Sequence, residues 1–259
     1  MRRILTAILL MFFITLPSMA DDRPVAIVTG SSHGLGHELA QLAAERGWRL
    51  VLVDIRPALS QQLAAVIREN GGEALVIEAD LADPSERPQI IEHTLEAYGR
   101  LDYLFNNAGY AYLATLEQMD LSAAHHLFEV NYWAYADLAQ RAIAPMRASG
   151  GGTIVNISSI LGVRPSPPGY AHYGATKHAL HGLFQTVAQE VAKDNIKVII
   201  AAPGGMRTSI GKHATGPLAD PAADRTATRE DPAIAAGDIF EALSGDEVVI
   251  YPGAVGRNR

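Results

Sequence analysis

The sequence predicts a single doubly wound α/β domain, with about seven parallel strands in one sheet and helices on both of its faces. Apolar, β-branched runs of strand length recur along the chain, and segments with helical spacing separate them. A length of 259 residues, 48% of them hydrophobic, suits one α/β domain with a large core. In such a sheet, ligands bind beyond the carboxyl ends of the strands.

The predicted elements alternate from residue 25 onward. We expect strands within residues 25–30, 48–54, 73–80, 101–109, 151–159, 196–204 and 246–253. We expect helices over residues 34–46, 57–70, 85–98 and 122–148, and a further helix from the YGATK motif to about residue 193. Because parallel neighbours need a crossover connection, which is usually a helix, this alternation is typical of the Rossmann fold.

Composition excludes several classes of function. The formal charge of −7 and the scattered basic residues argue against a nucleic-acid surface, so we expect no nucleic-acid partner. The absence of cysteine excludes disulfides, thiolate catalysis and cysteine-bound metals. Because His125 and His126 are adjacent, they point in different directions on a helix, and we expect no metal site.

The first twenty residues differ from the rest of the chain. Arg2 and Arg3 precede an apolar run, and small residues at Ser18 and Ala20 fit a signal-peptide cleavage site after Ala20. A retained membrane anchor and a translation start at Met19 are the alternatives. The chain is therefore expected to be exported or membrane-associated, with membrane contact through residues 1–20, or to be cytoplasmic if it starts at Met19. Residues 21–259 form the expected domain.

Two side chains in the YGATK motif can form a proton-transfer pair. Tyr173 and Lys177 are four residues apart, so they share one face of a helix. A nearby ammonium favours the phenolate, and lowering the tyrosine pKa by about two or three units is physically reachable. With the upstream Ser159 and a glycine-rich loop, the pair suggests hydride exchange at a carbonyl.

Five motifs occur in a fixed order at the ends of the predicted strands: TGSSHGLG, NNAG, NISS, YGATK and the PG of AAPGGMRT. In this order they resemble the short-chain dehydrogenase/reductase family over nearly the whole chain after residue 20. The resemblance implies an oxidoreductase that transfers a hydride between a nicotinamide cofactor and an alcohol or ketone. It also implies a homodimer or homotetramer.

The cofactor site is predicted at the first three strand ends. Glycines at 30, 34 and 36 permit a tight turn, so that the following helix presents N–H groups to a pyrophosphate. Asp54 can bind both hydroxyls of the adenosine ribose and repel a 2′-phosphate, which favours NAD, whereas His33 and Arg56 leave NADP possible. The predicted cofactor-binding residues are Gly30, Ser32, His33, Gly34, Leu35, Gly36, Asp54, Asp80, Leu81, Asn107, Tyr173, Lys177, Pro203, Gly204 and Thr208.

Several of these roles rest on the resemblance. It places Asp80 and Leu81 at the adenine, Asn107 at a ribose, Lys177 at the nicotinamide ribose and Thr208 at the carboxamide. Asn106 would fix the central sheet together with Asn107.

The predicted catalytic residues are Asn131, Ser159, Tyr173 and Lys177. By the resemblance, Ser159 polarises the substrate carbonyl, Tyr173 exchanges the proton, and Asn131 holds a water that connects Lys177 with solvent. Ser158 competes with Ser159, and Tyr170 offers a second phenol, but only Tyr173 has a lysine four residues later.

The substrate site is predicted at a polar, Gly/Pro/Ala-rich stretch late in the chain. Residues 205–232 occupy the place of the family's substrate-binding loop, and loops of this kind order around ligands. Residues that could border its entrance are Tyr110, Tyr112, Pro165, Pro167, Pro168 and His172. They suggest a small, partly apolar alcohol or ketone. The alternative function is a cofactor-binding regulatory or scaffold protein with little turnover.

Overall fold

A computed structural model of the chain describes residues 21–220, 222 and 229–253. Its centre is a seven-stranded sheet in the order β3-β2-β1-β4-β5-β6-β7, and every neighbouring pair of strands is parallel. The strands are β1 (Val25–Thr29), β2 (Arg49–Asp54), β3 (Ala74–Glu78), β4 (Tyr103–Asn106), β5 (Gly152–Ile157), β6 (Ile196–Ala201) and β7 (Val249–Ile250). The doubly wound fold class is confirmed.

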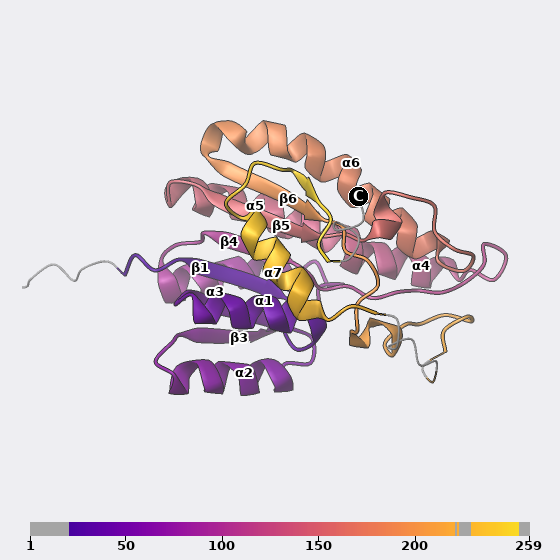
Figure 1. Cartoon of the computed structure of the whole chain (residues 1–259), viewed down its shortest axis with the longest axis horizontal. Helices are drawn as coiled ribbons and strands as arrows, with labels where there is room; N and C mark the ends of the chain where they lie inside the picture. Colours follow the sequence, from indigo (N-terminus) through magenta and orange to yellow (C-terminus); the bar gives the residue numbers. More distant parts are fainter. Residues whose placement is uncertain (1–20, 221, 223–228, 254–259) are drawn as a thin grey trace, which may run out of the picture.

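Helices cover both faces of this sheet (Figure 1). One face carries α1 (Gly34–Glu45), α2 (Ala58–Glu69) and α7 (Pro232–Ala242), and α7 (yellow) crosses in front of the strands in Figure 1. The other face carries α3 (Arg87–Tyr98), α5 (Ala134–Ala148) and α6 (Ala171–Val191), and α4 (Leu121–Phe128) extends from this layer toward the strand ends.

The alternation of side chains along each strand divides the core in two. Ala26 and Val28 of β1 pack into the cluster under α1, α2 and α7, whereas Ile27 between them packs into the cluster under α3, α5 and α6. All three are fully buried, because successive side chains point to opposite faces and both faces are covered. This explains why the strand reads as an unbroken apolar run.

The helix predicted over residues 122–148 is interrupted. The structure has α4, then a π-helical turn (Glu129–Trp133), then α5. A π turn holds one residue more than an α turn, and such insertions are frequent at functional sites. Here the turn carries Asn131 with its side chain fully buried.

Helix α7 was not predicted from the sequence, where the polar stretch up to residue 232 was followed only by a strand. Asp231 accepts a hydrogen bond from the backbone N–H of Ala233, and Pro232 occupies the first turn, which together begin the helix. Before it, short 3-10 turns form Ile160–Gly162, Ala192–Asp194 and Ser209–Gly211.

The predicted leader, residues 1–20, lies outside the described residues, so the structure does not test it. Across residues 21–220, 222 and 229–253, no helix has both the length and the apolar character needed to cross a bilayer.

Candidate active site

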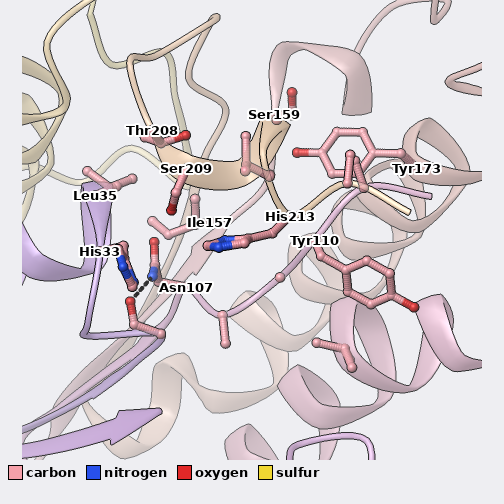
Figure 2. A pocket seen from close by; sticks show the side chains of 18 of the residues that line it. His33, Leu35, Asn107, Tyr110, Ile157, Ser159, Tyr173, Thr208, Ser209 and His213 are labelled. Atoms are coloured by element: carbon pink, nitrogen blue, oxygen red, sulfur yellow. Dashed lines mark hydrogen bonds between the residues drawn. The ribbon is translucent and has the colours of Figure 1, made fainter. Parts of the chain in front are cut away.

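A cavity of about 940 Å³ lies at the carboxyl ends of the strands. These strand ends are at the right of the sheet in Figure 1. This volume lies at the upper end of the range for ligand sites. Of the residues predicted to bind cofactor or substrate, the cavity is lined by Gly30, His33, Leu35, Asp54, Asp80, Leu81, Asn107, Ser159, Tyr173, Lys177, Pro203, Gly204 and Thr208. Figure 2 shows how the side chains from these separate segments converge.

The glycine-rich loop between β1 and α1 leaves no room for a side chain at its third glycine. A Cβ at Gly36 would lie 2.2 Å from the carbonyl oxygen of Gly30 and 2.4 Å from Nδ2 of Asn107. His33, at the N-cap of α1, makes no side-chain capping hydrogen bond, so the first N–H groups of the helix are left for another partner. A helix N-terminus with this geometry fits a phosphate group.

Asp54 and Ser32 hold the loop from β2. One carboxylate oxygen of Asp54 accepts a hydrogen bond from the N–H of Ser32 (3.1 Å), and the other accepts one from the N–H of Arg56 (2.9 Å). The Ser32 hydroxyl is buried; it donates to the Arg56 carbonyl (2.9 Å) and shares a hydrogen bond with Ser60 (2.9 Å). Asp54 therefore faces the cavity, and Ser32 supports the loop from behind.

The two asparagines of the NNAG motif have different partners. Nδ2 of Asn107 donates to the carbonyls of Thr29 (2.9 Å) and Gly30 (3.2 Å), so this side chain clamps the glycine loop at the edge of the cavity. Asn106 is fully buried and donates to Oδ1 of Asn156 (3.0 Å), which ties β4 to β5. The structure thus places Asn106 in the central sheet, as expected.

Lys177 and Tyr173 lie on the first turns of α6. Nζ of Lys177 donates to the carbonyl of Ile157 (2.8 Å) and lies 5.7 Å from the centre of the Tyr173 ring and 5.2 Å from that of Tyr135. Because the ammonium is almost completely buried, desolvation lowers the pKa of Lys177 to about 7.

The expected lowering of the Tyr173 pKa is wrong. Burial raises the pKa of this phenol to about 12, although the interaction with the Ser159 hydroxyl acts in the opposite direction. Desolvation disfavours the phenolate and, at the same time, weakens the ammonium that would stabilise it. The phenol therefore keeps its proton at neutral pH.

The two serines of NISS are separated by their hydrogen bonds. Both line the cavity, but the buried Ser158 hydroxyl donates to the carbonyl of Lys177 (3.1 Å), which attaches β5 to α6. Ser159 accepts a local hydrogen bond from the N–H of Leu161 (3.1 Å), and its hydroxyl lies beside the Tyr173 phenol (Figure 2). The geometry therefore favours Ser159 over Ser158 for contact with a ligand.

Asn131 and Lys177 face a common space at Gly109. Oδ1 of Asn131 accepts from the N–H of Tyr110 (3.1 Å), and its Nδ2 donates to the carbonyl of the same residue (3.0 Å). A Cβ at Gly109 would lie 3.0 Å from Oδ1 of Asn131 and 3.8 Å from Nζ of Lys177. The glycine thus keeps open the space between the amide and the ammonium.

Comparison with known proteins identifies the family. The family described as short chain dehydrogenase matches residues 24–217. The chain belongs to the short-chain dehydrogenase/reductase family. Enzymes of this family are oxidoreductases that use NAD or NADP, and the glycine loop, the uncapped start of α1 and the volume of the cavity fit such a dinucleotide.

Individual relatives are similar over most of this dehydrogenase. The 2,5-dichloro-2,5-cyclohexadiene-1,4-diol dehydrogenase LinX of Sphingobium indicum is 34% identical over 72% of the chain and 74% of its own length. A short-chain dehydrogenase structure from Streptomyces avermitilis is 31% identical with a TM-score of 0.81, covering 93% of this chain and 91% of that one. A short-chain dehydrogenase from Sphingobium yanoikuyae in complex with NADPH is 29% identical with a TM-score of 0.78, covering 88% and 87%.

In the loop after β6, this dehydrogenase places the predicted Thr208 and the unpredicted His213 at the cavity. His213 lines the cavity, and its ring packs edge-to-face on that of His33 in the glycine loop, with the ring centres 5.8 Å apart (Figure 2). Burial is the main cause that lowers the pKa of His213. Thr208 lies against Gly34, where a Cβ would come within 2.8 Å of its methyl group. The loop thus approaches the N-terminus of α1 at two points. No local sequence motif predicts these two contacts.

The predicted entrance residues divide into three groups. Tyr110 and Pro167 line the cavity, and the Tyr110 hydroxyl shares a hydrogen bond of 2.8 Å with Nδ1 of His126. Tyr112 is buried behind the wall; its hydroxyl accepts from the N–H of Asp120 (2.8 Å), and its ring packs on His172 at 5.7 Å. Pro165 and Pro168 are exposed.

Proposed function

We propose that the enzyme interconverts small, partly apolar alcohols and ketones, with NAD as the preferred cofactor. The observation that carries the proposal is the convergence of Ser159, Tyr173 and Lys177 on the cavity that also contains the glycine loop and Asp54. A hydroxyl, a protonated phenol and an amine beside a dinucleotide site are the groups that hydride exchange at a carbonyl requires.

Each side chain has a defined task in this proposal. The bound nicotinamide supplies or accepts the hydride. In reduction, the Ser159 hydroxyl donates a hydrogen bond to the carbonyl oxygen, and Tyr173 transfers its proton to the same oxygen. A pKa of about 12 keeps that proton on Tyr173 until the oxygen becomes basic. Oxidation reverses the proton transfer.

Lys177 and Asn131 serve the proton path and the cofactor. Lys177 is proposed to bind the nicotinamide ribose with the amine that now donates to Ile157. With a pKa of about 7, this amine changes its protonation state near neutral pH. The space beside the exposed Gly109 suits a water, placed next to the Tyr110 backbone that Asn131 holds, that passes protons between Lys177 and solvent.

The preference for NAD is proposed from Asp54. Its carboxylate lines the cavity at the end of β2, where it can accept hydrogen bonds from ribose hydroxyls and repel a 2′-phosphate. His33 and Arg56 line the same part of the cavity and could partly offset this repulsion. NADP is therefore expected to be used less efficiently and not to be excluded.

The walls of the cavity support a partly apolar substrate. Leu113, Leu161, Pro167, Met206 and Ile210 line it beside the polar groups. The relative from Sphingobium indicum is named as a dehydrogenase of a cyclic diol, and a ring alcohol or ketone is accordingly a good first probe. Residues 205–232 are proposed as the segment that selects among such substrates. Homodimer or homotetramer assembly stays a prediction.

A panel of cyclic and linear alcohols and ketones, assayed with NAD(H) and NADP(H), tests the proposal. We expect turnover with at least one ring alcohol or ketone, and a higher kcat/KM for NAD than for NADP. Binding of cofactor without turnover across the whole panel would contradict the proposal and favour a regulatory or scaffold protein.

A further inference from the structure

A buried arginine that belongs to none of the family motifs lies behind the cofactor cavity. Arg87 is the first residue of α3, and its side chain is only 4% exposed. Its Nε and Nη2 atoms both donate to the carbonyl of Leu81, at 2.9 and 2.7 Å. Nη2 also donates to Oε2 of Glu129 (2.8 Å), and Nη1 lies 3.7 Å from a carboxylate oxygen of Asp137.

These contacts join two segments that are far apart in the sequence. Leu81 follows β3, whereas Glu129 begins the π turn after α4. Leu81 and Val130, the neighbour of Glu129, both line the cavity. The guanidinium thus spans the gap between two apolar walls of the cofactor site.

The buried positive charge of Arg87 is balanced by nearby carboxylates. Glu129 and Asp137 supply two carboxylates, and the Leu81 carbonyl supplies a further acceptor. A guanidinium reaches these groups together because its five N–H donors are spread over three nitrogens of one plane, whereas the three donors of a lysine ammonium sit on a single atom. Removing it would take both side-chain donors from the carbonyl of the buried Leu81 and one from Glu129, whereas Asp137 would keep its ion pair with Arg141.

The segment after β3 has a second anchor beside the first. Glu86, the residue before Arg87, accepts a hydrogen bond from the backbone N–H of Asp80 (2.8 Å). Asp80 and Leu81 therefore present their side chains to the cavity from a loop held at both of its residues. Asn131, in contrast, is held by Tyr110 and Thr176, independently of Arg87.

We infer that Arg87 is a positioning residue for the adenosine half of the cofactor. It fixes Leu81 and Asp80 relative to Val130, and so sets the width of the part of the cavity that receives a planar base. Arg87 itself does not touch the ligand. The inference rests on dinucleotide binding by the family and not on the proposed substrate, so it can fail or stand independently of the alcohol or ketone.

Equilibrium binding of AMP and NADH to the full-length protein tests this role. For Arg87→Met we expect the Kd of both ligands to rise about tenfold or more, because the two walls lose their common donor. Arg87→Lys keeps the charge and should recover part of the loss. The matched control is Arg141→Met, which removes an exposed arginine from the same Asp137 (2.7 Å) and should change either Kd by less than about twofold.

A split between binding and turnover separates positioning from general damage. With a substrate in hand, KM for the dinucleotide should rise in Arg87→Lys while kcat at saturating cofactor stays within about threefold, since Asn131 keeps its own anchors. If Arg87→Met does not fold, Arg87→Lys and Glu129→Gln carry the binding test, and both should weaken AMP. Folded variants that bind AMP as tightly as the wild type, or a loss as large in Arg141→Met, would overturn the inference.

Discussion

Burial of the Lys177 ammonium should destabilise the folded protein, and its replacement by methionine should show this. The amine is 3% exposed, and its pKa falls from the ordinary value of 10.5 to about 7 because of desolvation. Each pKa unit corresponds to about 1.4 kcal/mol, so the charged form costs about 5 kcal/mol relative to the unfolded chain. Methionine has a similar length and no charge.

Part of this cost is offset by a contact that the variant loses. Nζ of Lys177 donates to the buried carbonyl of Ile157, and leaving that carbonyl unpaired costs about 2 kcal/mol. Lys177→Met is therefore expected to raise the free energy of unfolding by about 3 kcal/mol below pH 7 while abolishing turnover. A gain in stability with a loss of function is the expected signature of a charge kept buried for chemistry.

The stability difference between Lys177→Met and the wild type should decrease as the pH rises. Below about pH 7 the amine is protonated in both the folded and the unfolded state, so the full cost is present. As the pH rises from about 7 toward 10.5, the folded wild type releases its proton while the unfolded chain retains it, and wild-type stability increases. The advantage of the variant should shrink by about 1.4 kcal/mol per pH unit and vanish near pH 9.

Urea unfolding followed by circular dichroism, at several pH values and without added cofactor, measures this difference. Lys193→Met is the matched control, because Lys193 is an exposed lysine just beyond the same helix and should change stability by less than about 0.5 kcal/mol. A methionine variant less stable than the wild type near pH 6, or a difference that does not change with pH, would refute the reasoning.

Three further substitutions test other parts of the site. Gly109→Ala places a methyl group between Asn131 and Lys177, so we expect kcat to fall about tenfold in steady-state assays while cofactor binding is retained. Asp54→Ala removes the carboxylate from the ribose site, so the ratio of kcat/KM for NAD to that for NADP should fall about a hundredfold. Gly36→Ala places a methyl group 2.2 Å from a loop carbonyl, so we expect loss of NADH binding in fluorescence titrations and a lower Tm.

The glycine substitutions share a control. Gly237→Ala, in α7, adds a methyl group that meets nothing within 4 Å, and it should leave activity and binding unchanged. Full activity in Gly109→Ala would remove the reason for a water path at that place. An unchanged ratio of kcat/KM for NAD to that for NADP in Asp54→Ala would show that other groups set the preference for NAD. Normal NADH binding in Gly36→Ala would contradict the assignment of the glycine loop to phosphate binding.

Much of the fold was predictable because local patterns of apolar and polar residues determine its strands and most of its helices. Unbroken apolar strands and intervening helices specify a parallel sheet covered on both faces, and the seven strands formed where the runs occur. Helix α7 escaped prediction because the stretch before it is polar and its start depends on a single Asp-Pro cap. The π turn around Asn131 could not be predicted, since its surrounding sequence has ordinary helical spacing.

The site was predictable where one short segment supplies the chemistry. Tyr173 and Lys177 share a helix face by their spacing alone, and the structure brings both to the cavity with Ser159. Their electrostatics were not predictable, because the degree of burial that sets both pKa values depends on the whole fold. Contacts made across long sequence separations, such as Arg87 with Glu129 or His33 with His213, have no sequence signal at all.

The central claim is that the Tyr173 phenol exchanges the proton while the dinucleotide carries the hydride. Its most direct test compares Tyr173→Phe with Tyr170→Phe, the neighbouring phenol that also lines the cavity, on the best substrate of the panel. The account predicts that Tyr173→Phe loses turnover about a thousandfold while NADH binds with nearly wild-type affinity, and that Tyr170→Phe remains active. Wild-type turnover in Tyr173→Phe would contradict it.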